Sequence, residues 1–249
     1  MNPVTGLVLR RRSVWEAFDS GVLLWRGSFA LFIPFFAIPV WIAAFSFRFI
    51  ARDFYIIPYF AIWWLKPLFD KALLHVLSRR FFSNPEPLRG KELLRGLWET
   101  IRRGLPGDLL WRRFSPYRAA HMPIRVLERT DSKQFSLRKK ALARGGLSFC
   151  LLLSIICLAA EAVLLLGEIV FAIMMINIIS PAALSGISGN WTSIEIFIFA
   201  AFCLNYILVE SLYVCMGFGL YINSRIELEG WDLELLFRKF AARAGEKLP

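Results

Sequence analysis

The chain has 249 residues, of which 57% are hydrophobic, 15% aromatic and 20% charged, and its mean hydropathy is +0.54. Soluble domains are typically about 45–50% apolar and about 25% charged, so this composition excludes an ordinary soluble globular protein. The formal net charge is +11, and residues 79–144 carry all of this excess, with 17 Lys or Arg against six Asp or Glu. We therefore expect an all-α, polytopic membrane protein with one strongly basic region.

The N-terminal part predicts a short cytoplasmic segment, residues 1–27, and two membrane helices within residues 28–78. The first membrane helix fits Ser28–Phe47, which contains no charge and has the length needed to cross the hydrocarbon core of a bilayer. Pro34 and Pro39 are expected to bend it, because a proline has no N–H to donate to the preceding turn.

The second apolar segment, from Phe54 to Leu77, contains charged residues within its length. Lys66 lies near its midpoint, Pro67 follows directly, and Asp70 is four positions further on the same face of a helix. A charge at the bilayer centre costs about 2.5–3.5 kcal/mol on insertion scales, so such a side chain usually faces a partner or water. We therefore expect Lys66 to form an ion pair with a carboxylate of another helix, with Asp70 also within reach.

Residues 79–146 form the predicted basic cytoplasmic region. Apolar residues between Leu94 and Ile101 recur at the spacing of one helical face, with arginines around them. This pattern is typical of a helix that lies in the plane of the lipid headgroups, and equally of a soluble amphipathic helix packed on a neighbour. The following stretch, residues 105–136, is expected to be irregular because several prolines and glycines interrupt it.

The C-terminal half predicts two further membrane helices within residues 147–223. The first is apolar from Leu147 to Ile179, and at about 1.5 Å per residue such a helix is longer than a bilayer is thick, so it must tilt, break or begin below the membrane surface. The second runs from Ile194 to Ile222. Residues 224–249 then predict a cytoplasmic amphipathic helix.

The distribution of charge predicts the orientation in the membrane. Lys and Arg precede the first span and fill the region between the second and third spans, whereas the loop between the third and fourth spans, residues 180–193, has neither. Cytoplasmic loops carry an excess of Lys and Arg. Four spans with both termini and the basic region in the cytoplasm agree with this rule.

Three glutamates in the last two spans join Lys66 and Asp70 as a candidate intramembrane charge network: Glu161, Glu168 and Glu210. Three interpretations of this network are open. It could form a pathway for ions or protons or a site for an anionic substrate, or it could be a structural ion pair that orients the helices. In the third, the second span is a shallow hairpin from which Lys66 reaches the headgroups. We favour structural pairing.

Catalytic signatures are missing from the sequence. It contains no HExxH motif, phosphate-binding loop, nucleophile elbow or dinucleotide-binding glycine motif. The only histidines, His75 and His121, have no cluster of ligand residues around them, so we expect no metal and no other cofactor. Membrane topology explains the basic block without nucleic acid, and anionic lipids attract such residues. The sequence therefore predicts neither an enzyme nor a nucleic-acid-binding protein.

Basic and aromatic residues of the basic region and of the C-terminal helix predict a cytoplasmic interaction surface. Its members are Arg102, Arg103, Trp111, Arg112, Arg113, Tyr117, Arg118, Trp231, Phe237 and Phe240. We expect protein partners on the cytoplasmic side or within the membrane, and a homo-oligomer is a further option.

Three stretches together resemble an uncharacterised bacterial inner-membrane protein family: "WWLKPLFDKALLHVLSRRFF" (63–82), "WRRFSPYRAAHMPIRVLE" (111–128) and "ESLYVCMGFGLYINSRIELEGWDLELLFRKFA" (210–241). In that family, the genes lie in clusters with a MoxR-type AAA ATPase, von Willebrand factor A proteins and membrane-anchored transglutaminase-like proteins. The resemblance implies no known reaction. It implies membership of an envelope-associated assembly in the bacterial inner membrane.

The charge pattern and the resemblance together predict a non-catalytic scaffold or assembly subunit of an envelope-associated complex. The alternative is a small transporter or channel that uses Lys66 and the carboxylates of the charge network. Four spans leave little room for a pathway in one chain, so transport would require an oligomer.

Overall fold

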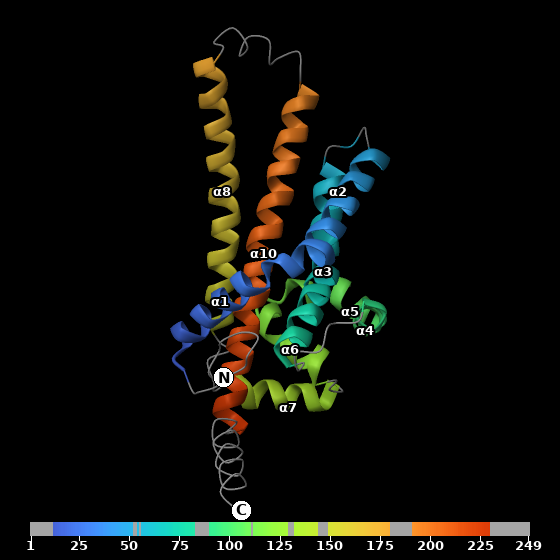
Figure 1. The fold of residues 1–249 in the computed structure, drawn as a ribbon, viewed down its shortest axis with the longest axis vertical. Helices are drawn as coiled ribbons and strands as arrows, with labels where there is room; N and C mark the ends of the chain where they lie inside the picture. Colours follow the sequence, from blue (N-terminus) through green and yellow to red (C-terminus); the bar gives the residue numbers. More distant parts are fainter. Residues whose placement is uncertain are drawn as a thin grey trace, which may run out of the picture.

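The computed structural model describes the chain over residues 12–51, 54, 56–82, 90–110, 112–128, 132–143, 149–179 and 191–229. Every element within these ranges is a helix, so the predicted all-α fold is confirmed. Two long helices, α8 (Cys150–Ile179) and α10 (Trp191–Glu229), stand side by side along the long axis of the molecule (Figure 1).

A second group of helices packs against α10. The helix α1 (Val14–Phe32), the π-helical segment η1 (Ile33–Ala37) and α2 (Ile38–Ile50) form one continuous helical run, and α3 (Ile56–Phe82) lies beside α2. In Figure 1, α1 crosses the long helices obliquely, whereas α2 rises beside α3. The direction changes at η1, where Pro34 has no N–H for the preceding turn and the wider π-helical turn accommodates it.

In the described part of the chain, three helical segments are long and apolar enough to cross a membrane: Val14–Ile50, Cys150–Met175 and Ile194–Leu228. Only 17% of the most apolar stretch of Cys150–Met175 is buried inside the protein. Water around such a surface would cost about 25 cal/mol for each Å² of apolar area. These helices therefore give the chain the character of a membrane protein.

The remaining predicted span, α3, is not among these three segments. Any 18 consecutive residues of α3 include Lys66, Asp70 and Lys71. By composition alone, the helix therefore carries too many charges to be a candidate membrane span. Its C-terminal part is nevertheless the most enclosed stretch of the helix, since residues 70–78 are all buried. Asp70 and Lys71 of α3 are therefore placed inside the protein, where other charged side chains can compensate them.

The first and last described helices, α1 and α10, cross at close range. A Cβ atom on Gly21 would lie 2.9 Å from the carbonyl oxygen of Cys215, and a Cβ atom on Gly219 would lie 2.6 Å from the carbonyl oxygen of Ala17. Larger residues would separate the two helices. Hydrogen bonds flank the crossing: Trp25 Nε1 donates to Ser211 Oγ at 2.7 Å, and Asn223 Nδ2 donates to the Arg12 carbonyl at 3.0 Å.

Short helices gather around the lower half of the long ones (Figure 1). We call the part of the chain from residue 90 to residue 143 the basic platform. Its elements are α4 (Gly90–Arg102), α5 (Leu105–Leu110), the 3-10 helix η2 (Arg112–Phe114), α6 (Arg118–Leu127) and α7 (Ser132–Ala143).

The prediction that residues 105–136 are irregular is wrong, although no long helix forms there. Pro106 occupies the first turn of α5, where the missing N–H costs nothing because helix-start N–H groups have no partner in the helix. Pro123 is tolerated within the ten-residue helix α6. Gly104 separates α4 from α5 with a φ of 67°, a conformation that favours glycine.

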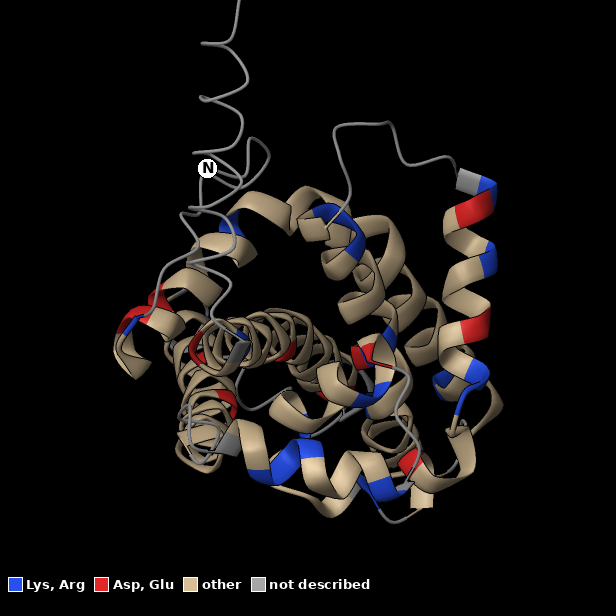
Figure 2. Ribbon diagram, turned by 90° about the horizontal axis from the view of Figure 1, so that it is seen from below, with Lys and Arg blue, Asp and Glu red and all other residues tan. Residues whose placement is uncertain are grey.

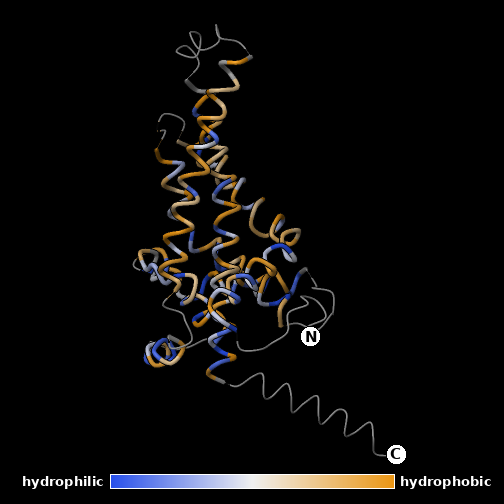
Figure 3. The backbone as a smooth tube through the Cα atoms, turned by 90° about the vertical axis from the view of Figure 1, so that its left-hand side faces the viewer, coloured by the Kyte–Doolittle hydropathy of each residue, from blue (hydrophilic) through white to orange (hydrophobic). Residues whose placement is uncertain are grey.

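Hydropathy and charge divide the molecule along its long axis. Apolar residues predominate in the long helices, whereas hydrophilic residues gather in the lower half, among the short helices (Figure 3). Seen from below, Lys and Arg are spread over the helices that surround the lower ends of the long ones (Figure 2). Of the predicted C-terminal helix, residues 224–249, the structure describes residues 224–229 as the end of α10, whereas Trp231, Phe237 and Phe240 lie outside the described residues, as does Trp111.

Two glycines of α1 allow the close crossing to be tested with a matched control. We expect Gly21→Ala to lower the free energy of unfolding by about 1–3 kcal/mol, because the added methyl group overlaps the backbone of α10. Gly27→Ala meets nothing within 4 Å and should be neutral or stabilising by up to about 1 kcal/mol. Thermal unfolding of the purified variants in detergent measures both effects. Equal melting temperatures would contradict the close crossing.

Candidate functional site

Five charged side chains meet where α3, α6, α8 and α10 come together. We call them the charge cluster: Lys66 and Asp70 from α3, Arg118 from the first turn of α6, Glu161 from α8 and Glu210 from α10. The cluster therefore joins α3, α8 and α10 to α6 of the basic platform.

Lys66 pairs with two glutamates from two different helices. Its Nζ lies 2.5 Å from Glu210 Oε2 and 3.3 Å from Glu161 Oε1. The same ammonium group lies 5.3 Å from the centre of the Tyr206 ring, whose face attracts cations. Lys66 thus faces carboxylate partners on α8 and α10.

Arg118 supplies the second cation of the cluster. Its Nε lies 3.1 Å from Asp70 Oδ2, and its Nη2 donates a hydrogen bond to Glu210 Oε1. Glu210 therefore lies between two cations, with one carboxylate oxygen toward Lys66 and the other toward Arg118. The side chains of Asp70 and Glu210 are 0% and 3% exposed, so water contributes little to compensating their charges.

Two residues of the predicted network, Asp70 and Glu168, have partners other than Lys66. Asp70 lies one helical turn from Lys66 but forms its ion pair with Arg118. Glu168 is separate from the cluster: its carboxylate accepts a hydrogen bond of 2.9 Å from Asn205 Nδ2. Glu168 lies seven positions after Glu161, about two helical turns along α8, and this distance takes it away from Lys66.

Arg118, which the sequence assigns to a cytoplasmic interaction surface, has a side chain that is only 15% exposed and lies in the cluster. Its local sequence, directly after the turn at Ser115–Tyr117, has no periodicity that would reveal this. Charge balance is the signal that could have found it. Lys66 alone cannot compensate Asp70, Glu161 and Glu210, and so a second buried cation was required.

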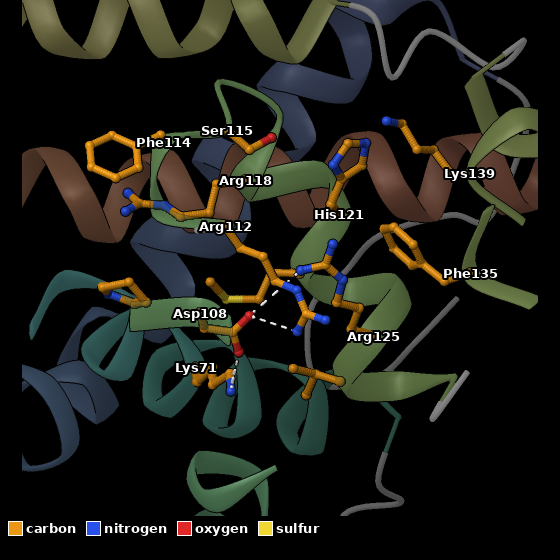
Figure 4. Close-up of a pocket in the computed structure, with 13 residues that line it drawn as sticks. Lys71, Asp108, Arg112, Phe114, Ser115, Arg118, His121, Arg125, Phe135 and Lys139 are labelled. Carbon is orange, nitrogen blue, oxygen red and sulfur yellow. Dashed lines mark hydrogen bonds and ion pairs between the residues drawn. The ribbon is translucent and has the colours of Figure 1, made fainter. Parts of the chain in front are cut away.

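A cavity of about 540 Å³ lies beside the cluster, between α3, α5, α6 and α7. We call it the basic pocket (Figure 4). Of the described residues, five cationic side chains line it together with one carboxylate: Lys71, Arg112, Arg118, Arg125, Lys139 and Asp108. Aromatic and aliphatic side chains, including Phe114 and Phe135, complete its wall.

Asp108 is shared by three of these cations. Arg112 Nη1 lies 3.2 Å and Arg125 Nη1 lies 3.6 Å from its Oδ1, and Lys71 forms an ion pair with Oδ2 (Figure 4). Lys71 Nζ also donates a hydrogen bond of 2.6 Å to the Arg103 carbonyl. One carboxylate therefore faces three cations, and the pocket keeps a positive excess.

The electrostatics of the pocket follow from this crowding. Burial and the neighbouring charges of Lys139 and Arg125 lower the pKa of His121 to about 4, so this histidine is neutral at pH 7. Burial and the nearby Arg112 guanidinium also lower the pKa of Arg125, while Asp108 opposes this effect. The guanidinium carbon of Arg125 lies 4.2 Å from the centre of the Phe135 ring.

Helix α4 packs on α3 and keeps an apolar face exposed. Leu93 is buried, and the hydroxyl of Thr100 lies 3.1 Å from His75 Nδ1 of α3. On another face, Leu94 is 57% and Trp98 is 62% exposed. The helix thus has both a packed face and an accessible amphipathic face.

The other residues of the predicted interaction surface lie around the platform. Arg102 lies over the exposed Trp98 ring, with 5.9 Å between the guanidinium carbon and the ring centre. Arg103 pairs with Glu99 one turn earlier at 2.9 Å. Tyr117 is half-buried against His121, Arg112 lines the basic pocket, and the side chain of Arg113 lies outside the described part of the structure.

A groove of about 200 Å³ opens next to the cluster, between α3 and α8. Lys66, Glu161 and Glu210 line it, and the first two side chains are 16% and 23% exposed. Phe114, Ser115 and Arg118 line both the groove and the basic pocket. The short segment from η2 to α6 therefore separates the two spaces.

Comparison with models of protein families, with curated proteins and with solved structures finds no match to this chain.

Two glutamates of the long helices provide a test of the cluster. We expect Glu210→Gln to lower the free energy of unfolding by about 3–5 kcal/mol, because it leaves Lys66 and Arg118 without their shared carboxylate. Glu168→Gln removes the same charge but affects one hydrogen bond to Asn205, so about 1 kcal/mol is expected. Urea or thermal unfolding in detergent compares the two variants. Similar losses for both would contradict a special role of the cluster.

Proposed function

We propose that the chain is a non-catalytic integral subunit of an envelope-associated assembly in the bacterial inner membrane. In this proposal α3 is a fourth span, both termini lie in the cytoplasm, and the basic platform presents a surface to a partner protein there. The proposal rests on the arrangement of charges in the structure and on the resemblance to a bacterial inner-membrane family.

The observation that carries the proposal is that the charged side chains of the cluster pair with one another. Both cations and all three carboxylates of the cluster engage each other across four helices. Buried pairs of this kind fix helices in one arrangement, and their rupture costs about 3–5 kcal/mol. A platform attached through Arg118 is held rigidly against the long helices, which suits a subunit that positions a partner.

Placing α3 in the membrane agrees with the same contacts. A charged residue within a span is tolerated when it faces the inside of the bundle and is paired. Lys66 and Asp70 both meet this condition. The platform contains most of the excess Lys and Arg, and residues 180–193 at the other ends of α8 and α10 have none, which supports a cytoplasmic platform.

The accessible face of α4 is the best candidate for the partner surface. It combines the exposed Leu94 and Trp98 with Arg102, which lies over the Trp98 ring. Tryptophan and arginine are enriched among residues that dominate protein–protein binding energy. Contacts with α3 hold the helix in place from its opposite side, so this face is presented on a rigid support.

Affinity purification from native membranes tests the proposal. We expect the wild-type chain to retain partner proteins at fixed stoichiometry in mild detergent. The variant Trp98→Ala/Arg102→Glu should reduce their yield at least about tenfold, because truncating central interface residues costs about 2 kcal/mol or more. Lys140→Glu, an exposed lysine on α7 and therefore on another helix, serves as the control for charge. A wild-type chain that purifies without any partner would overturn the proposal.

A second candidate function is transport, and the groove beside the cluster favours it. The groove reaches Lys66 and Glu161, and both side chains are partly exposed to it. If the protein is a transporter, Lys66→Met should abolish ion flux into liposomes while the protein still folds. If pairing is purely structural, the same variant should lose several kcal/mol of stability, and the wild type should show no flux above empty liposomes.

A further inference from the structure

We propose that the basic pocket binds a phosphate-bearing anion, either a phospholipid headgroup or a soluble phosphate compound. This inference is independent of the partner surface on α4 and of transport through the groove. It rests on the charge, the shape and the position of the pocket.

Among the described residues, the cations that line the pocket outnumber its carboxylates. Arg118 is compensated by Asp70 and Glu210 in the adjoining cluster, but Lys71, Arg112 and Arg125 share the single carboxylate of Asp108. Lys139 adds a further positive charge to the lining. In the cluster two cations face three carboxylates, whereas in the pocket four cations apart from Arg118 face one. An anion in the pocket would supply the missing counter-charge.

The donors in the pocket have the geometry that phosphate recognition uses. Arg112 and Arg125 approach the same oxygen of Asp108, so their guanidinium groups lie close together at one wall (Figure 4). Guanidinium groups bind phosphate oxygens through paired N–H donors. Lys139 and the hydroxyl-bearing Ser115 line the same cavity and add further donors.

The pocket is also of suitable size and lining for an amphiphilic anion. Its volume of about 540 Å³ falls within the range of about 300–1,000 Å³ of small-molecule sites. Phe114 and Phe135 provide apolar surface next to the cations. Phe114 also borders the groove between α3 and α8, so the apolar wall of the pocket continues toward the exposed apolar surface of α8.

Direct binding to the full-length chain in an uncharged detergent tests this site. Two probes distinguish the sources of phosphate: phosphatidylglycerol, measured by native mass spectrometry, and sodium pyrophosphate, measured by calorimetry. We compare the wild type with Arg112→Gln/Lys139→Gln, which removes two lining charges. The control, Arg80→Gln/Lys140→Gln, removes the same charge from positions that do not line the pocket.

We expect the pocket variant to bind at least one probe about tenfold more weakly than the wild type, a loss of about 1.4 kcal/mol, while the control binds within about twofold. Loss of phosphatidylglycerol binding alone assigns a lipid headgroup, and loss of pyrophosphate binding assigns a soluble phosphate. If neither probe binds the wild type, or if variant and control weaken equally, the proposal is wrong. Lys139→Gln against Lys140→Gln, two exposed neighbours on α7, repeats the comparison should the double variant not fold.

Discussion

Glu210 holds the two halves of the protein together. One oxygen of its carboxylate faces Lys66 of α3 and the other faces Arg118 of the basic platform, in a site that is almost closed to water. Desolvated charges are stable only when they are paired and hydrogen-bonded. This requirement fixes how α3, α6 and α10 meet, and Glu161 extends the same constraint to α8.

Arg118 connects this cluster, in which carboxylates outnumber cations, to a pocket in which cations are in excess. The cluster uses its charges inside the protein, whereas the pocket has a surplus of cations around Asp108. The two sites differ in function for that reason: mutual pairing stabilises an arrangement of helices, and unpaired excess charge attracts an anion from outside. Arg118 belongs to the cluster and also lines the pocket. The ion pairs of the cluster therefore lie directly behind one wall of the pocket.

The sequence predicted the parts of the fold that follow from local patterns. Long apolar runs identified α8 and α10, and the high cost of an isolated buried charge led from Lys66 to an interhelical carboxylate partner. It did not predict Arg118 in the cluster, because that contact depends on a turn near Pro116 and on packing between segments far apart in the chain. The helix around Leu94–Ile101 was predicted, but α5 and α6 were not, because prolines such as Pro106 and Pro123 usually interrupt helices. Pro106 lies in a first turn and Pro123 in a short helix, where they are tolerated.

The crossing of α1 and α10 has a consequence for the order of assembly. The Arg12 backbone exchanges two hydrogen bonds with the Asn223 side chain, 211 positions later in the chain, and Gly21 faces the backbone of α10. During synthesis α1 emerges well before the surface of α10 that it packs against. Contacts between such distant segments form late, after a long loop has closed. The helix α1 therefore remains without this native neighbour until α10 has also been synthesised.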